Sequence, residues 1–242
     1  MTAEAGFRHL AMSYFSDGLA QAWQLLADMD KATFSAVEVT LVSTSLSIAL
    51  ALLAGLPAGF CLGYFSFPGR RALRLVSDTL LAFPTVLIGL IVYVLLTYRG
   101  PLGHLGLLFT LPGMVIGQTL LALPIVVSWT AQAVEGQDMR LRQTLLTLGA
   151  SRVQLAWLTI REARYEIGMV CATAFGRVVT EVGVAMMLGG NIRNSTRTMT
   201  TAISLETSKG EFAQGIALGL VLLLIAFAVN GLLACLKARN RK

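Results

Sequence analysis

The chain has 242 residues, of which 55% are hydrophobic and only 13% are charged, whereas soluble domains average about 25% charged residues. This composition argues against an ordinary soluble enzyme and indicates an all-α, polytopic membrane protein. The net charge of +6 is therefore interpreted as a topology signal, and no nucleic-acid partner is expected. The three cysteines, Cys61, Cys171 and Cys235, lie far apart in apolar runs, which predicts neither a disulfide framework nor a metal site.

Residues 1–32 are expected to form an extracytoplasmic segment ahead of the membrane domain. From Phe7 to Leu26 the apolar residues recur near helical spacing, but the run is too polar to cross a bilayer. This favours an interfacial helix on the outer surface, and an extension that is disordered without a partner is the alternative. The acidic residues here, and the absence of a basic start followed by an apolar core, argue against a cleavable signal peptide.

Residues 33–238 are expected to form a single membrane domain with five transmembrane helices. A helix needs about 20 apolar residues to cross the hydrocarbon core, and five stretches qualify: 36–62, 79–98, 111–132, 167–190 and 212–236. The loops on one side carry twelve lysines and arginines, against six on the other side. The richer side is predicted to be cytoplasmic, which places the N-terminus outside and the C-terminus inside.

Prolines and glycines punctuate the first three spans. The prolines stand at positions 57, 84 and 124 and predict kinks, because proline removes a backbone donor. Gly55, Gly59 and Gly63 recur every four residues in GLPAGFCLG, so one face of the first span carries only small residues. The spacing favours close packing against another helix, with gating at the kinks as the alternative.

A charged, helix-prone loop at 133–166 separates the third and fourth spans. Apolar residues recur on both sides of Gly149, which predicts two short helices joined at that glycine. Two interpretations are open from the residues alone: the pair inserts into a groove of a soluble partner, or it packs on its own bundle. The residues predicted for coupling to a partner are Gln143, Leu145, Leu148, Gly149, Ala150, Ser151 and Arg152.

The fourth span contains two charged residues, Arg177 and Glu181, whose separation of four predicts a shared helix face. Charges inside a membrane usually face the bundle interior or an aqueous cavity. Either the two form an ion pair, within one protomer or between two, or Arg177 lines a translocation path. In the second case the nearby Glu181 would keep the attraction for an anion weak, as a path requires.

The segment 191–211, NIRNSTRTMTTAISLETSKGE, is too polar to span and rich in hydroxyls. Hydroxyl and cationic donors can replace the water that an oxyanion sheds. We therefore predict an extracytoplasmic gate, and a plain solvated loop is the alternative. The candidate gate residues are Arg193, Arg197, Thr200, Thr201 and Ser204.

The loop around Gly149 resembles the coupling loop of ABC-importer permeases, which engages a cytoplasmic ATPase. LAFPTVLIGLIVYVLL, RGPLG and FGRVVTEVGVAMMLGGNIRNSTRTMTTAISLETSKGEF resemble the tungstate branch of the molybdate, tungstate and sulfate permeases. The resemblance covers residues 17–236. Two departures stand out: Gln143-Thr144-Leu145 replaces the usual Glu-Ala-Ala, which weakens the case for an acidic contact at position 143, and Arg161-Glu162 replaces Leu-Pro.

The resemblance implies the fold, the partners and the location of the protein. It implies a type I (MetI-like) importer permease fold and a homodimer in the lipid of the bacterial cytoplasmic membrane. Separate cytoplasmic ATPase subunits and an extracytoplasmic oxyanion-binding protein would act with it. The chain has no GxxxxGK[ST] phosphate loop, so we expect a transport subunit rather than an enzyme, with no cofactor of its own.

Three functions remain open. The first is the permease of a tungstate importer, and the second is a molybdate or sulfate permease of the same architecture. The third is a self-sufficient secondary transporter or channel. The long helical loop, the absence of an inverted repeat and the few intramembrane acids argue against the third.

Overall fold

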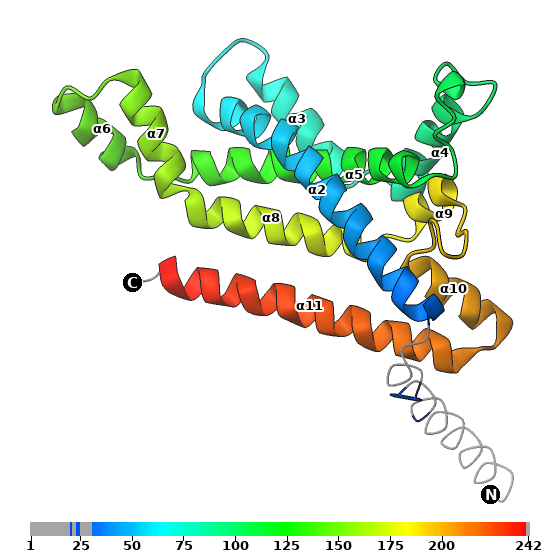
Figure 1. Ribbon diagram of the computed structural model, residues 1–242. Helices are drawn as coiled ribbons and strands as arrows, with labels where there is room; N and C mark the ends of the chain where they lie inside the picture. Colours follow the sequence, from blue (N-terminus) through cyan, green and yellow to red (C-terminus); the bar gives the residue numbers. More distant parts are fainter. Residues whose placement is uncertain (1–19, 21–22, 25–30, 241–242) are drawn as a thin grey trace, which may run out of the picture. The chain divides into compact units, whose positions relative to one another are not determined.

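The computed structural model describes residues 20, 23–24 and 31–240 (Figure 1). That part of the chain is helical and contains no strand. The interfacial helix predicted within residues 1–32 falls almost entirely outside the described residues. Internal contacts divide the chain into two compact units. Unit 1 comprises Met1–Ser43, Gly89–Met114 and Val179–Phe227, and unit 2 comprises Thr44–Ile88, Val115–Val178 and Ala228–Lys242.

Three of the described helices are long and apolar enough to cross a membrane unaided. They are α2 (Lys31–Tyr64), α5 (Leu111–Glu135) and α11 (Phe212–Asn240), the last through its portion Phe212–Val229. These helices confirm the first, third and fifth predicted spans to within a few residues at most boundaries. Proline is tolerated inside α2 and α5, at positions 57 and 124, because neighbouring groups can satisfy the carbonyl that it leaves without a donor.

The second predicted span, 79–98, is not one continuous helix. It begins in the last turn of α3 (Arg70–Leu81) and continues as α4 (Thr85–Leu96). Pro84 stands in the gap, where its ring disfavours a helical conformation for the residue before it. The proline was expected to kink a helix, and in the structure it separates two helices.

The fourth predicted span, 167–190, is also broken. It consists of α8 (Arg164–Val179) and α9 (Gly183–Gly189). In the gap, the carboxylate of Glu181 accepts hydrogen bonds from the backbone N–H groups of Gly183, at 3.0 Å, and Val184, at 3.4 Å. An oxygen acceptor at this place satisfies amides at the start of a new helix. The described residues therefore contain three long spans, or five if each bent pair crosses as one.

Unit 1 is held together by a small buried core that joins α2, α10 (Met199–Lys209) and α11. One polar contact reinforces it: the backbone N–H of Met199 donates to Thr40 Oγ1 at 2.8 Å. This bond ties the start of α10 to α2 and gives a partner to a backbone N–H that is removed from solvent, where an unpaired N–H would be costly. The core residues are Ala36, Met199, Ala202 and Leu218.

Unit 2 is built on the close approach of α2 to α5. A Cβ atom added at Gly59 would lie 2.6 Å from the carbonyl oxygen of Val127, and one added at Gly63 would lie 2.6 Å from that of Ala131. At Gly55 the added atom would lie 2.7 Å from a side-chain carbon of α5. These distances leave no room for a side chain. The prediction of close packing along this glycine stripe is confirmed.

Candidate functional site

The predicted helix–glycine–helix element is present as α6 (Met139–Thr147) and α7 (Arg152–Glu162), shown in green in Figure 1. Gly149 has φ +81°, a left-handed conformation that residues with a Cβ adopt at a cost. Its N–H donates to the carbonyl of Leu146 at 3.1 Å, and the N–H of Ala150 donates to that of Leu145 at 3.0 Å. This pair of bonds is a Schellman motif, which closes a helix at a left-handed residue.

A second cap follows immediately. The backbone N–H of Gln154 donates to Ser151 Oγ at 3.3 Å, and the N–H of Ser151 donates to Gln154 Oε1 at 2.8 Å. This capping box begins α7 two residues after Gly149. Because one helix is closed and the next is opened within three residues, local hydrogen bonds set the turn of the α6–α7 hairpin.

Apolar side chains of the α6–α7 hairpin are strongly exposed. Leu148 is 77% exposed, Val153 79% and Trp157 67%, whereas Leu155 between them is buried at 4%. An open groove of about 490 Å³ is lined by both helices, Leu145 and Leu158 included. Large apolar residues gathered in this way mark an interaction surface. We call Leu148, Val153 and Trp157 the apolar ridge.

The other residues predicted for coupling all fall on this hairpin. Gln143, Ser151 and Arg152 are exposed, and Leu145 and Ala150 are half-buried. Ser151 is engaged in the capping box and Ala150 in the Schellman motif. The structure therefore gives Gly149, Ala150 and Ser151 a conformational role.

The spacing of Arg177 and Glu181 predicted that they share one helix face, but no continuous helix contains both residues. Helix α8 ends at Val179, so Arg177 lies two residues before its end and Glu181 lies in the gap beyond it. Arg177 is exposed, while Glu181 is 5% exposed and bonded to the first amides of α9. The spacing rule fails here because it presumes unbroken helix.

The predicted gate segment is largely ordered as α10 rather than as a loop. Thr198 begins the helix with a capping box, in which its side chain accepts from the N–H of Thr201. Thr200 Oγ1 donates to the carbonyl oxygen of Glu181 at 2.9 Å. Thr200 and Thr201 are buried, and the hydroxyls of these two predicted gate residues form hydrogen bonds within the protein.

The charged residues of the same segment differ in their exposure and in their ion pairs. Arg197 Nη1 lies 3.8 Å from Glu206 Oε1, and Lys209 Nζ lies 3.2 Å from the same oxygen. Glu206 is only 5% exposed, so the two cations balance a buried carboxylate. Of the five predicted gate residues, Arg193 and Ser204 are the ones that are exposed.

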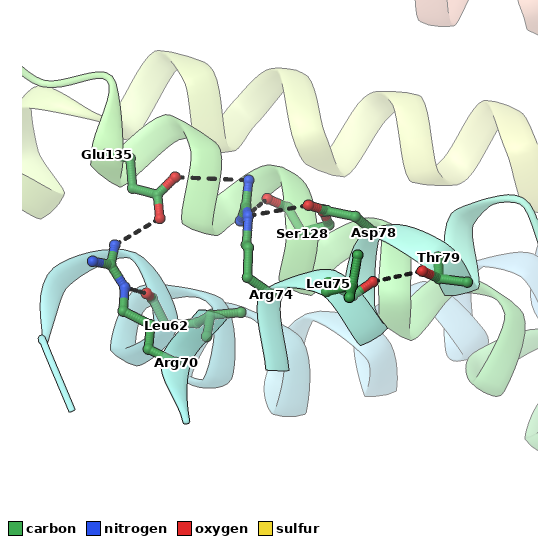
Figure 2. A network of polar contacts seen from close by, with 8 residues as sticks. All are labelled: Leu62, Arg70, Arg74, Leu75, Asp78, Thr79, Ser128 and Glu135. Atoms are coloured by element: carbon green, nitrogen blue, oxygen red, sulfur yellow. Dashed lines mark hydrogen bonds and ion pairs between the residues drawn. The ribbon is translucent and has the colours of Figure 1, made fainter. Parts of the chain in front are cut away.

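Sequence reasoning missed a set of polar contacts at the start of α3, shown in Figure 2. Arg70 Nη2 lies 2.7 Å from Glu135 Oε1, and Arg74 Nη2 lies 3.8 Å from Glu135 Oε2. Arg74 Nε also lies 3.4 Å from Asp78 Oδ2, and Ser128 Oγ donates to Asp78. We call these five residues the arginine latch.

A signal for the arginine latch was present in the sequence. Arg70, Arg74 and Asp78 recur every four residues, so they share one face of α3, but the arginines were used only to predict topology. Leu75 and Val76 of the same helix are 68% and 54% exposed. Helix α3 therefore turns its polar face to the protein and its apolar face outward, as suits a membrane surface.

Metal-ligating side chains do not gather anywhere in the described part of the chain. Cys61 and Cys235 are exposed and Cys171 is half-buried. The described residues thus form no cluster in which a resident metal ion would be held.

The profile of the family "Binding-protein-dependent transport system inner membrane component" matches residues 55–242. The chain belongs to this family. It is 49% identical to the tungstate uptake system permease protein TupB of Campylobacter jejuni over 92% of this chain and 93% of that protein. It is 35% identical to the TupB of Peptoclostridium acidaminophilum, over 93% and 99%.

Among solved structures, a chain of the inward-facing MetNI methionine ABC transporter has the same fold, with a TM-score of 0.66 at 16% identity over 86% of this chain and 98% of that chain. The α6–α7 hairpin and the arginine latch both lie within the matched residues 55–242. As an inner membrane component of binding-protein-dependent transport, the protein is an ABC-importer permease of the MetI-like fold. The expected family and fold are confirmed.

Proposed function

We propose that the chain is the membrane-spanning subunit of an ATP-driven importer of tetrahedral oxyanions, with tungstate as its substrate. The observation that carries this proposal is the 49% identity, over nearly the whole chain, to the permease protein of a tungstate uptake system. A second relative named for tungstate uptake supports it at 35% identity.

The α6–α7 hairpin is the docking element for a cytoplasmic ATPase in this proposal. Its apolar ridge exposes Leu148, Val153 and Trp157, and a short helix with exposed apolar side chains suits a groove on a soluble partner. The sequence carries no phosphate loop, so a separate subunit hydrolyses the ATP. The hairpin then lies inside the cell, with the N-terminus of the chain outside.

Two copies of the chain form the translocation unit, and an extracytoplasmic binding protein delivers the anion. Arg193 and Ser204, the exposed members of the five candidate gate residues, contact that protein. Arg177 lines the path. Arg197 attracts the passing anion only weakly because Glu206 balances its charge, and weak attraction lets an ion leave as well as enter.

The test is reconstitution in liposomes of this chain with its ATPase and its binding protein. We expect ATP-dependent uptake of tungstate, with molybdate and sulfate competing less well when each is delivered at equal concentration. Uptake of sulfate in preference to tungstate would replace the substrate. Transport by the purified chain without ATPase or nucleotide would overturn the proposed function altogether.

A further inference from the structure

We infer that the arginine latch positions the α6–α7 hairpin and thereby couples ATP hydrolysis to transport. Glu135, the last residue of α5, is the central group, and Arg70 and Arg74 act on the hairpin through it. The coupling role rests on the proposed function, because it presumes that an ATPase docks on the hairpin. Its structural part, that the latch orders the hairpin, is independent of the substrate.

Arg70 joins three helices at one point (Figure 2). It is the first residue of α3, its Nε donates to the carbonyl of Leu62 at 2.8 Å, and its Nη2 donates to that of Gly63 at 3.1 Å. These carbonyls belong to the last turn of α2, where donors are scarce and a cation is favoured. The remaining contact of Nη2, at 2.7 Å, is with Glu135.

Arg74 fixes α3 to α5 one turn further along. Its Nη1 donates to the carbonyl of Ser128 at 2.8 Å, while its other nitrogens face Glu135 and Asp78. Ser128 and Glu135 lie seven residues, or about two turns, apart on α5. Helix α3 is therefore held along α5 and cannot pivot about a single ion pair.

Glu135 needs these cations because it stands at the C-terminus of α5. A carboxylate at a helix C-terminus opposes the helix dipole, whereas nearby guanidinium groups compensate for it. The side chains of Arg70, Arg74 and Glu135 are 32%, 22% and 36% exposed, so the pairs are partly shielded from water. Partial burial strengthens such contacts relative to exposed ion pairs.

The position of Glu135 connects the latch to the hairpin. Only residues 136–138 separate it from the first residue of α6, Met139. A cleft of about 260 Å³ is lined both by Arg70 and Glu135 of the latch and by three leucines of the hairpin, Leu145, Leu155 and Leu158. Because only this short link joins the hairpin to α5, the direction in which the chain leaves α5 is one determinant of where the hairpin stands.

The first experiment needs no partner. Amide hydrogen exchange of the purified chain in lipid nanodiscs is compared for wild type, Glu135→Gln and Arg71→Gln. Arg71 is the matched control, because it is the exposed neighbour of Arg70 on α3 and lies outside the latch. We expect residues 139–162 to exchange at least about fivefold faster in Glu135→Gln and unchanged in Arg71→Gln. Equal exchange in all three chains would overturn the inference.

The second experiment measures coupling in the full transport complex. We expect Glu135→Gln and Arg74→Gln to raise the ATP hydrolysed per anion imported at least about fivefold, and Arg71→Gln to leave the ratio as in wild type. A wild-type complex without ATP-dependent uptake would refute the proposed function. If the wild type imports the anion and the latch variants keep its ratio, the coupling role of the latch is refuted and the proposed function stands.

A charge-rescue arm covers the case in which a latch variant assembles poorly. Glu135→Cys is made in a background lacking Cys61, Cys171 and Cys235, with Glu135 retained in the control. After assembly, an anionic methanethiosulfonate reagent is compared with a neutral one of similar size. Recovery of the wild-type ratio with the anionic reagent alone supports the latch, and equal results with the two reagents contradict it.

Discussion

The backbone N–H of Ala150 donates a 3.0 Å hydrogen bond to the carbonyl of Leu145, across the left-handed Gly149. Nothing lies within 4 Å of a Cβ added at Gly149. The requirement for glycine is therefore conformational and not steric.

Gly149→Ala should accordingly weaken the turn by about 1 kcal/mol and lower the ATPase activity of the assembled complex. Gly149→Asn is the matched change, because asparagine tolerates the left-handed region, and we expect it to retain most of the activity. Equal loss in the two variants would show that the turn conformation is not the cause.

The apolar ridge should bind the ATPase without stabilising the chain itself. Trp157→Glu should cost about 2 kcal/mol or more of binding free energy, seen as loss of the ATPase subunit on co-purification. The Tm of the chain alone should hardly change, because Trp157 is 67% exposed.

Leu155→Ala is the opposite case on the same helix. Leu155 is 4% exposed, so its truncation should cost about 2–5 kcal/mol if unfolding is cooperative, read as a lower Tm. If Trp157→Glu destabilised the chain as much as Leu155→Ala, the ridge would be part of the fold.

The glycine stripe of α2 makes a sharp prediction for stability. Gly59→Ala would place a carbon 2.6 Å from Val127 O and 2.7 Å from Thr130 Cβ, which should destabilise the chain by about 1–3 kcal/mol. Gly219→Ala in α11 is the control, since nothing lies within 4 Å of the added carbon and alanine favours helix. Thermal unfolding in detergent should separate the two, and equal Tm values would contradict the close contact.

The buried carboxylate of Glu206 should be costly to neutralise. Glu206→Gln removes the carboxylate that balances Arg197 and Lys209, and removal of one partner from a buried pair costs about 3 kcal/mol. Arg197→Gln in the Glu206→Gln background should restore part of that stability. Additive losses in a double-mutant cycle of thermal unfolding would show that Arg197 and Glu206 do not interact.

Arg177 and Glu181 should respond differently to substitution. Glu181→Gln replaces the carboxylate that accepts from the amides of α9 by a neutral amide, so we expect a lower Tm. Arg177→Ala removes an exposed cation from the proposed path, so we expect reduced anion uptake. A fall in Tm without a fall in uptake for Arg177→Ala would assign Arg177 a purely structural role.

Features that depend on neighbours in sequence were predictable. Gly149 marked the hairpin because apolar residues recur on both sides of it, and Gly55, Gly59 and Gly63 marked a packing face because they recur every four residues. The three long spans followed from hydropathy, which depends on composition over about 20 residues.

Features that depend on distant partners were not predictable in the same way. Arg70 and Glu135 are 65 positions apart, so the repeat of polar residues on α3 marks a polar face but does not identify Glu135 as its partner. The break before α9 was missed because hydropathy averages over Thr180 and Glu181, whereas in the structure Glu181 accepts from the following amides. The burial of Thr200 and Thr201 was hidden for a similar reason, since a hydroxyl-rich run looks solvated until its partners are known.

The four-residue repeat of Gly55, Gly59 and Gly63 also limits how α2 and α5 can move. If α2 slid a short way along its axis, the Cβ atoms of residues beside the glycines would move toward the carbonyl oxygens of Val127 and Ala131. These oxygens can lie close to α2 because the glycines have no side chain. Only a jump of about 6 Å, four residues of rise, would seat each glycine in the place of the next. The two helices should therefore move together during the transport cycle, because only a four-residue step would let one slide along the other.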